Sequence, residues 1–502
     1  MESQSTHYDL AVIGGGSGGS AAALAAARAG LRVVIVERGA MLGGTATQGG
    51  VNCWEMGAGG TGIPFDVYRR MKQDHPDAIG IYSYGRHFSW QDAWYWPHAP
   101  DKVNFPGGEL LIDPGRRYLE SLRRHPDPGQ PPTEAWCREH WHGLPFLPEP
   151  MAATLRAMLE ETGNAEIRLN TGFAGVHARN GRVNSVTLDD GGELQATMWV
   201  DGAGGVFCHA LGCETLRGVD PRSRFNEPGA PEVGSDAVNG VTLVYKIMPG
   251  YADAIEPLPD DVPSECWWAP HFPPMSCVQD PDMGRTCNML PTMEGKEQIQ
   301  LGYEAAYQEC LRRVKAHWRF VQTHWPEFRR YRMTWVAPML GIREGRRVVC
   351  EKMLTENDIR LGISRQTDPD IITVADHALD RHGEDGQCPE LDGPYGVPYR
   401  CLIPRGWRNL LVAGRAAGFS SIAASSCRQT RTMMQLGQAA GTAAAIAAEG
   451  GIDLPDVPPQ DLRASLREQN VQLDWPMPPD LVTHLSASDQ AVRSDRPRGE
   501  QP

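Results

Sequence analysis

The chain has 502 residues, enough to bury a large core and to form about two domains. Its formal net charge is −14 and its sequence pI is about 5.6, which argues against nucleic acid as a partner because phosphate neutralisation needs a basic surface. No apolar run approaches the length of a membrane span, and the N-terminal residues lack the basic and apolar regions of a secretory signal.

The cysteines are scattered along the chain. There are twelve, and none forms a Cys-x-x-Cys pair, which argues against a zinc ribbon, a dithiol redox pair and an iron–sulfur cluster. We therefore expect no metal site. Cys208 and Cys213 are the closest pair, and we expect them to be reduced core thiols, so that the expected location is the cytoplasm.

The stretch from Tyr8 to Glu37 reads as strand, glycine turn, helix and strand. An apolar run from Tyr8 to Ile13 ends in three glycines, and a segment of almost pure alanine follows from Ser20 to Ala29. A second apolar strand, Arg32 to Val36, then ends at Glu37. This order of elements is typical of a dinucleotide-binding unit.

The glycines of this stretch match the spacing G-x-G-x-x-G at Gly14, Gly16 and Gly19. The first glycine allows a tight turn, the second lets the backbone approach a pyrophosphate, and the third allows the helix to pack closely on the strand. The helix N-terminus supplies free N–H groups for the same pyrophosphate, and a carboxylate at Glu37 suits the ribose hydroxyls. The pattern predicts dinucleotide binding, with an ordinary glycine turn as the alternative.

Residues 38–62 are rich in glycine but interleave apolar residues such as Met41, Val51 and Trp54. A flexible linker rarely has this composition. Backbone that follows a flat or phosphorylated ligand explains both features, since glycine allows close approach and apolar side chains anchor the segment.

Two aromatic clusters dominate residues 63–150, beside expected short helices at Asp66 to Gln73 and Asp113 to Arg124. The clusters comprise Trp90, Trp94, Tyr95, Trp96, His98 and Phe105, and then Trp136, His140, Trp141, His142 and Phe146. They are interpreted either as a lid over a substrate pocket or as a cap packed on its own aromatics.

The next elements alternate helix and strand. Met151 to Thr162 is an expected amphipathic helix, and hairpin turns are expected at Asn180-Gly181 and Asp190-Gly191. A strand then meets the glycine turn that ends at Gly205. It is no second fingerprint, because neither an alanine-rich helix nor a downstream acid follows.

The middle of the chain predicts a strand at Val241 to Met248 and a long helix from Glu304 to Tyr331, broken at Pro326. Beyond it, two polar clusters stand among apolar neighbours. The first is Arg343, Glu344, Arg346 and Arg347; the second is His377, Asp380 and His382. The apolar neighbours of the arginines favour a strand with partly buried guanidinium groups, whereas surface charge and a helix-face pair are the alternatives.

The C-terminal part begins with an apolar strand, Trp407 to Ala413, which leads into Gly414. A helix from Cys427 to Ala448 carries small residues at 437, 440, 441, 444 and 448. Such a face permits very close packing, here on the first helix and on a cofactor. The last fifteen residues are expected to be disordered.

Taken together, the two ends resemble the FAD-dependent oxidoreductases with a glutathione-reductase-like (GR2-type) FAD-binding fold. The motifs that carry the resemblance are VIGGGSGGSAAALAAARAG with VVIVERGAMLGGTAT, GIREGRRV, LDRH, VPYRCLIPRGWRNLLVAGRAAG and LGQAAGTAAAIA. The chain departs from the family pattern at Gly202-Ala203-Gly204, where Ala-Thr-Gly is usual, and at Gly345, where Ser or Thr is common. It keeps the family's Asp-x-His as Asp380 and His382.

The resemblance implies FAD as the cofactor. The fingerprint and Glu37 would hold its ADP half, Gly43 to Thr45 would follow the pyrophosphate, Phe173 and Ala174 would meet the adenine, and Gly414-Arg415 with the Gly437 region would flank the flavin ring. The expected cofactor-binding residues are Gly14, Gly16, Ser17, Gly18, Gly19, Glu37, Arg38, Gly43, Gly44, Thr45, Phe173, Ala174, Gly204, Gly414, Arg415 and Gly437.

The expected fold is α/β, a discontinuous Rossmann-like FAD-binding domain with an inserted α+β substrate or cap domain. The FAD-binding segments would be residues 1–62, 150–212 and 395–450, the insertions 63–149 and 213–394, and a partly disordered extension 451–502.

The expected function is an oxidoreductase acting on a small organic substrate, with oxygen, a quinone or another acceptor rather than a stably bound nicotinamide. His382, His377, Arg343, Tyr399 and Arg400 are the candidate catalytic residues. A flavin-dependent monooxygenase or halogenase, and a protein in which the dinucleotide is structural or consumed, are the alternatives. Neither nucleic acid nor membrane is an expected partner, and a homodimer is left open.

Overall fold

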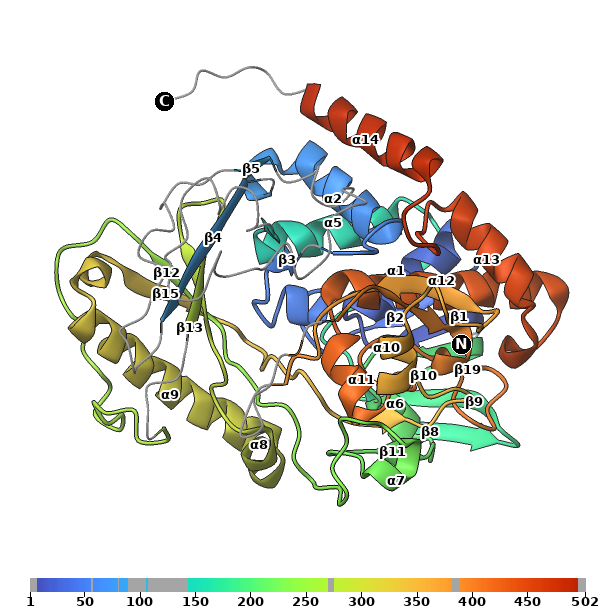
Figure 1. Ribbon diagram of the computed structural model, residues 1–502, viewed down its shortest axis with the longest axis horizontal. Coiled ribbons are helices and arrows are strands. Elements are labelled where there is room, and N and C mark those ends of the chain that lie inside the picture. Colours follow the sequence, from blue (N-terminus) through green and yellow to red (C-terminus); the bar gives the residue numbers. More distant parts are fainter. Residues whose placement is uncertain are drawn as a thin grey trace.

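The computed structural model describes residues 7–55, 57–79, 81–88, 105–106, 143–269, 275–381, 389 and 391–494. Two hydrophobic cores organise these residues (Figure 1). The first surrounds a largely parallel sheet built from strands within residues 7–201 and 410–412, and the second surrounds an antiparallel sheet built from strands within residues 81–106 and 245–336. Figure 1 separates them as the right and left halves of the molecule.

The first sheet has seven strands in the order β7-β2-β1-β10-β9-β8, with β19 also paired to β10. The strands are β1 (His7–Ile13), β2 (Val33–Val36), β7 (Ala165–Arg168), β8 (Phe173–Arg179), β9 (Arg182–Leu188), β10 (Glu193–Asp201) and β19 (Leu410–Val412). Strands β7, β2, β1, β10 and β19 run parallel, and their pairing aligns Val36, Ile13, Asp201 and Val412 at one edge. Strands β2, β1, β10 and β19 therefore end side by side at this edge of the sheet.

Both predicted hairpins are confirmed. Strands β8 and β9 pair antiparallel around Asn180 and Gly181, whose φ angles are 54° and 69°. Strands β9 and β10 pair around Asp190 and Gly191. Asparagine and glycine adopt this left-handed backbone readily, which is why this dipeptide marks hairpin turns.

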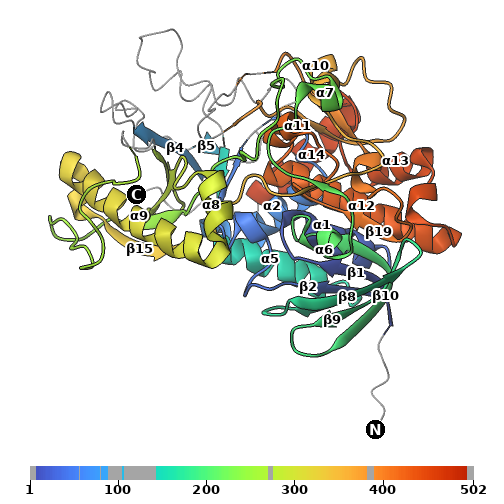
Figure 2. The same ribbon diagram turned by 90° about the horizontal axis from the view of Figure 1, so that it is seen from below.

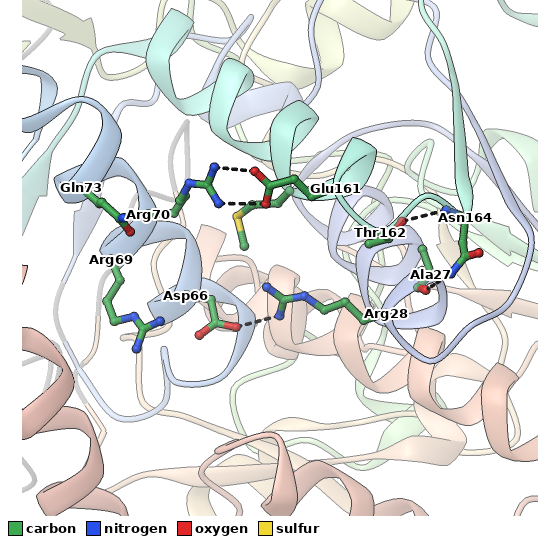
Figure 3. Close-up of a pocket in the computed structure, with 10 residues that line it drawn as sticks. Ala27, Arg28, Asp66, Arg69, Arg70, Gln73, Glu161, Thr162 and Asn164 are labelled. Carbon is green, nitrogen blue, oxygen red and sulfur yellow. Dashed lines mark hydrogen bonds and ion pairs between the residues drawn. The ribbon is translucent and has the colours of Figure 1, made fainter.

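Three helices lie together in the first core, where the third packs on the other two. They are α1 (Ser17–Arg28), which follows β1, α2 (Ile63–Asp74) and α5 (Pro148–Glu160). At their ends, Arg28 pairs with Asp66 at 2.7 Å and Arg70 forms a two-bond pair with Glu161 (Figure 3). These pairs surround a polar surface hollow of about 440 Å³ and join α2 to its two neighbours.

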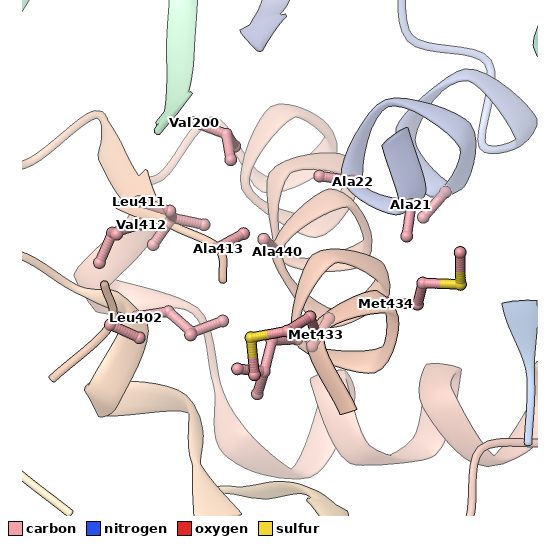
Figure 4. Close-up of a cluster of buried hydrophobic side chains, with 14 of the residues drawn as sticks. Ala21, Ala22, Val200, Leu402, Leu411, Val412, Ala413, Met433, Met434 and Ala440 are labelled. Carbon is pink, nitrogen blue, oxygen red and sulfur yellow. The ribbon is translucent and has the colours of Figure 1, made fainter. Parts of the chain in front are cut away.

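Helix α12 (Thr430–Gly450) lies beside α1 in both views of the molecule (Figures 1 and 2). A β-carbon at Gly437 would lie 1.9 Å from the Gly18 carbonyl oxygen, and one at Gly441 would lie 2.2 Å from that of Ala22. The backbones therefore touch where the sequence predicts a small-residue face, and the two helices run in the same direction. Figure 4 shows the alanine and methionine side chains that fill this core beside β19.

The second core is built on a six-stranded sheet in the order β15-β12-β14-β13-β4-β5. Its strands are β4 (Ile81–Phe88), β5 (Phe105–Pro106), β12 (Tyr245–Met248), β13 (Met275–Gln279), β14 (Arg285–Met289) and β15 (Arg332–Val336). Helix α9 (Tyr303–His324), preceded by α8 (Gly295–Leu301), packs on it. The expected long helix does end before Pro326, where a 3₁₀ turn, η4 (Pro326–Arg330), takes over.

The remaining elements are short. Three strand pairs are β3 (Cys53–Glu55) with β6 (Gly143–Pro145), β11 (Thr215–Leu216) with β16 (Arg347–Val348), and β17 (Ile371–Ala375) with β18 (Tyr395–Pro398). The further helices are α6 (Val206–Ala210), α7 (Arg222–Phe225), α10 (Glu356–Leu361), α11 (Ser421–Ser426), α13 (Pro459–Glu468) and α14 (Pro479–Ser494). The 3₁₀ turns are η1 (Gly44–Ala46), η2 (Pro76–Ala78), η5 (Tyr399–Leu402) and η6 (Leu454–Asp456).

The C-terminal segment differs from expectation. The chain is helical in α13 and again in α14, which reaches Ser494, so disorder over the last fifteen residues is wrong as far as Ser494. Leu462, Leu466 and Leu485 are buried in the first core, and these contacts with distant parts of the chain stabilise a segment whose composition is polar.

The cores also divide the chain differently from the expected segments. Buried residues of α2 belong to the first core, as do those between Val348 and Leu391, although both regions are expected to be insertions. The second core takes its residues from Val241 to Leu340. In the described ranges, no helix is long and apolar enough to cross a bilayer.

Two further expectations concern side chains. Cys208 and Cys213 are buried free thiols, as predicted. Most of the two aromatic clusters and the helix expected at 113–124 lie outside the described residues. Phe146, however, is buried in the first core against Trp54, with ring centroids 5.0 Å apart.

Candidate functional site

A cavity of about 1270 Å³ lies at the aligned edge of the first sheet. The cavity is lined by the residues that end or follow strands β1, β2, β10 and β19: Ile13 and Gly14, Val36 and Glu37, Gly202, and Ala413 and Gly414. Ligands of open parallel sheets bind at the carboxyl ends of the strands, at the point where the strand order reverses. The volume exceeds the roughly 300–1,000 Å³ of an ordinary small-ligand pocket.

The fingerprint glycines divide into two structural groups. Gly14 has a φ of 99°, and a β-carbon there would lie 2.5 Å from the backbone nitrogen of Ala203; at Gly19 it would lie 1.9 Å from the Gly14 carbonyl oxygen. Gly16 is different, since its nearest neighbour would be the Gly202 carbonyl oxygen at 3.5 Å, an ordinary contact. No protein atom therefore requires glycine at position 16, whereas a ligand lying against the backbone does.

Glu37 is held in place by the turn that it faces. Its Oε2 accepts a hydrogen bond from the Gly15 backbone N–H at 2.7 Å, and its Oε1 accepts one from Gly39 at 2.7 Å. The carboxylate lines the cavity and retains acceptor capacity on both oxygens. This orientation suits ribose hydroxyls, as the sequence predicts.

Two helix N-termini open onto the cavity. Neither Gly16 at the start of α1 nor Gln429 at the start of α12 provides a side-chain cap. Ser17, Gly18 and Thr430, the residues that follow, line the cavity. Because α1 and α12 run in the same direction, both direct unsatisfied N–H groups and positive dipole ends to one space, where an anionic ligand is stabilised.

The C-terminal strand adds the other wall. Gly414 has a φ of 136° with no atom within 4 Å of its β-carbon position, so the backbone there lies open to the cavity. Arg415 follows, and its buried Nε has no hydrogen-bond partner. Burial lowers the pKa of Arg415. A phosphorylated dinucleotide fits this cradle, because it offers acceptors for the orphaned donor and lies against the open glycines.

Most of the expected cofactor residues line the cavity. These are Gly14, Gly16, Ser17, Gly18, Glu37, Arg38, Gly44, Thr45, Phe173, Gly204, Gly414 and Arg415. Gly19, Gly43, Ala174 and Gly437 do not. Gly19 and Gly437 serve close packing, Gly43 donates its backbone N–H to the Gly15 carbonyl at 2.8 Å, and Ala174 follows Phe173 on a strand whose successive side chains face opposite ways.

Arg343 lies on the wall that belongs to the second core. Its Nη1 donates hydrogen bonds to the Gly240 carbonyl at 2.9 Å and to Thr242 Oγ1 at 2.6 Å. Thr242, Ser276 and Asn288 line the cavity beside it. The second core thus contributes one oriented guanidinium and several neutral polar side chains to the space that the cradle opens.

His377 lies on the same cavity and is buried. Its Nδ1 lies 2.8 Å from the Ala378 carbonyl oxygen, and because a carbonyl can only accept, Nδ1 donates this hydrogen bond. Asp380, also on the cavity, pairs with Arg428 at 2.5 Å. His382 lies outside the described residues.

Tyr399 and Arg400 lie away from this cavity. Tyr399 is buried in η5, and its hydroxyl donates to the Leu454 carbonyl oxygen at 2.9 Å; burial raises its pKa. Arg400 pairs with Asp368 at 2.8 Å and with Asp370 at 3.0 Å. The expectation that both face the substrate pocket is not supported, because the turn after β18 directs them to structural partners.

Sequence reasoning missed several lining residues, among them Thr242, Ser276, Asn288, Gln298, Tyr303, Arg381 and Gln429. Gln429 had a usable signal, since it lies at the start of the small-residue helix that the sequence predicts. The residues of the second core had none, because the strand and the long helix predicted there do not indicate which side chains face the cavity. Glu344 was identified only as one member of the arginine cluster.

Comparison with solved structures finds similar chains at low identity. A geranylgeranyl bacteriochlorophyll reductase-like protein from Thermoplasma acidophilum is 12% identical, with 97% of this chain and 90% of that chain covered and a TM-score of 0.45. A flavin-dependent brominase is 12% identical, with 92% and 83% covered and a TM-score of 0.45. An anhydrotetracycline hydroxylase from Streptomyces rimosus is 12% identical, with 97% and 69% covered and a TM-score of 0.42. At these identities and TM-scores, none of the three structures indicates which reaction this chain catalyses.

The family comparison is specific. A search of curated proteins finds no match. The family model described as FAD dependent oxidoreductase matches residues 9–466, which include the fingerprint, most of the first core, the second core and helix α12. This chain therefore belongs to the FAD-dependent oxidoreductases, and its cofactor is FAD.

Proposed function

We propose that this flavoenzyme is a dehydrogenase or oxidase that oxidises a small organic substrate carrying an anionic group. One observation carries the proposal: the cofactor cradle of the first core and the polar residues of the second core line the same cavity. A molecule bound between them meets Arg343 and His377 as well as the cofactor.

The residues have separate roles in this proposal. When bound, FAD supplies the two-electron acceptor. The guanidinium of Arg343, with one nitrogen fixed by Gly240 and Thr242, would orient a carboxylate or a similar anion. The imidazole of His377, which lines the cavity, would take the proton that an alcohol or amine loses on oxidation. His382 is the alternative base, favoured by the resemblance of Asp380-x-His382 to the family motif.

Reoxidation is proposed to use oxygen, a quinone or another acceptor. The spacing G-x-G-x-x-G occurs at Gly14 and again at Gly57, but only the first match lines the cavity, where its cradle is the one assigned to FAD. The match at Gly57 follows the short strand β3, which pairs antiparallel with β6 and is not part of a second parallel dinucleotide-binding unit.

The test is anaerobic mixing of the FAD-loaded protein with pools of small carboxylate-bearing alcohols and amines. Bleaching of the flavin absorbance by one pool, followed by recovery with oxygen or a quinone, would support the proposal. NADH and NADPH at micromolar concentration are the controls, and rapid bleaching by either would contradict it. Reduction by NADPH with oxygen-dependent hydroxylation or halogenation would favour a monooxygenase or halogenase. A flavin that no pool bleaches would favour a structural cofactor.

A further inference from the structure

Residues 341–346 run along one wall of the cavity, and each of them lines that space. At the start of this segment, Gly341 forms a β-bridge with Thr242 of the second core. Directly after its end, β16 pairs with β11, and Val348 donates its backbone N–H to the Ala416 carbonyl oxygen at 2.8 Å, beside the cofactor cradle. The segment therefore connects the second core to the first core along the cavity.

An arginine lies near each end of this segment. Arg343 lies at the second core, where its Nη1 donates to the Gly240 carbonyl oxygen and to Thr242. Arg346 lies at the first core, since its Cβ is 3.5 Å from the position of a β-carbon at Gly205. A chain spans at most about 3.6 Å per residue, so the Cα atoms of the two arginines are separated by about 11 Å or less. One small molecule can therefore reach both side chains.

Arg346 also faces a second guanidinium group, that of Arg217. The pairing of β11 with β16 aligns Leu216 with Arg347, and the next step of the same register places Arg217 opposite Arg346. Both arginines line the cavity. Burial, and then the positive charge of Arg217, lower the pKa of Arg346. Like charges opposite each other in an antiparallel pair are destabilising, so this pair favours an anion between its members.

No acidic side chain neutralises the pair in the part of the chain that the structure describes. Neither Arg217 nor Arg346 forms an ion pair there, whereas Arg347, the next residue, is bound to Asp220. Arg217 is exposed. Arg346 is half-buried, and its guanidinium nitrogens remain accessible, unlike Arg347 Nε, which is enclosed without a hydrogen-bond partner. The pair thus presents accessible positive charge to the cavity.

The middle of the segment leaves room for a ligand. A β-carbon at Gly345 would meet no atom within 4 Å, so the backbone between Arg343 and Arg346 is open to the cavity. Glu344, the acid of the segment, is held by Asn239, which donates to its Oε2 from the backbone and the side chain at 3.1 and 3.2 Å. Among the described residues, seven arginines but three acidic residues line the cavity, although the chain has a net charge of −14. The pyrophosphate of FAD neutralises only part of this excess.

We propose that Arg343 and the Arg217–Arg346 pair form a two-part anion site, and that the substrate carries two anionic groups. A carboxylate is held at Arg343, a second carboxylate or a phosphate is held between Arg217 and Arg346, and the molecule lies over the open backbone of Gly345. Guanidinium groups suit both anions, because their N–H donors match the spacing of the anionic oxygens. No covalent bond changes in this binding step. The inference deepens the proposed function by naming the substrate class, and it rests on that proposal in placing the substrate in this cavity.

Four variants test the site. R217Q and R346Q each remove one charge from the pair and keep a polar side chain. G345T places a branched side chain on the open backbone, and the φ of Gly345 lies outside the left-handed region, so threonine can adopt it. R179Q is the matched control, because Arg179 is exposed, forms no ion pair among the described residues and does not line the cavity.

Calorimetry on the FAD-loaded protein at about pH 8, where the probes are ionised, compares doubly and singly charged probes of equal chain length. The pairs are succinate or 3-phosphonopropionate with butyrate, adipate with hexanoate, and suberate with octanoate. We expect at least one doubly charged probe to bind wild type about tenfold or more tightly than its partner. R217Q and R346Q should each reduce this preference to about threefold or less, G345T should weaken the doubly charged probe by about fivefold or more, and R179Q should follow wild type. Equal affinities within every pair, a preference that survives in both arginine variants, or an unchanged affinity in G345T would overturn the proposal.

The other possible occupant of the pair is the pyrophosphate of FAD. Titration of the FAD-free proteins separates the two sources, because the proposal expects R217Q and R346Q to bind FAD within about twofold of wild type. Much weaker FAD binding in these variants would assign the pair to the cofactor and overturn the proposal. None of these measurements requires turnover. A substrate with one anionic group that bleaches the flavin would support the proposed function and contradict this inference, whereas tight binding of a doubly charged probe without bleaching by any pool would do the reverse.

Discussion

Replacement of Gly437 by alanine tests how closely the two central helices must approach. The new β-carbon would lie 1.9 Å from the Gly18 carbonyl oxygen, and real β-carbons essentially never come within 3.0 Å of such an atom. The pair must therefore open by about 1.1 Å, the difference between these distances. A gap of that size forfeits a substantial part of the dispersion attraction between the buried alanine faces. We expect a net loss of about 1–3 kcal/mol, as for other overpacked cores.

Gly450 provides the control, because it is the last residue of the same helix. A β-carbon there would meet only Ile452 side-chain atoms, the nearest at 3.5 Å. Gly450→Ala should be neutral or stabilising by up to about 1 kcal/mol, since alanine favours helix more than glycine does. Urea unfolding of the FAD-free and FAD-loaded proteins measures both variants, with stability read from the midpoint. Equal midpoints for Gly437→Ala and wild type, with unchanged FAD content, would refute the packing argument.

Three further predictions concern the cradle and the chemistry. Gly16→Val should fold, because its first added atom meets only the Gly202 carbonyl at 3.5 Å, but it should purify without flavin absorbance; a fully yellow variant would contradict the assignment. Glu37→Arg should bind FAD more weakly, through lost ribose hydrogen bonds, and FAD titration of the FAD-free protein measures this. His377→Ala and Arg343→Ala should retain FAD but slow substrate-driven flavin bleaching by about 100-fold or more. Loss of FAD or of thermal stability instead would make these two residues structural.

The parts of the site that follow from local chemistry could be predicted from the sequence. Glycine spacing identified the turn after β1, and the position of Glu37 at the end of β2 followed from the same pattern. The small residues around Gly437 indicated a close helix contact, and the contact with Gly18 is observed. In each case a single short stretch contains the physical reason for the structure.

The remaining parts depend on contacts between distant residues. Arg347 and Asp220 are 127 positions apart, and their pairing is what neutralises this buried arginine. Nothing in the segment GIREGRR indicates which of its arginines is already neutralised. Tyr399 and Arg400 were misplaced for a similar reason, since their orientation depends on Leu454 and Asp370.

The order in which the ribosome delivers the chain has a consequence for α1. This helix is complete at Arg28, whereas α12, which covers it, starts at Thr430, about 400 residues later. At a rate of synthesis of roughly 5–20 residues per second, about 20–80 s pass between the completion of α1 and the start of α12, which covers its alanine face. Strand β19 leads into Gly414 of the cradle, and it is synthesised only shortly before α12. We therefore expect FAD capture to follow synthesis rather than accompany it, and a chain that stops before Thr430 to expose a surface suited to chaperones.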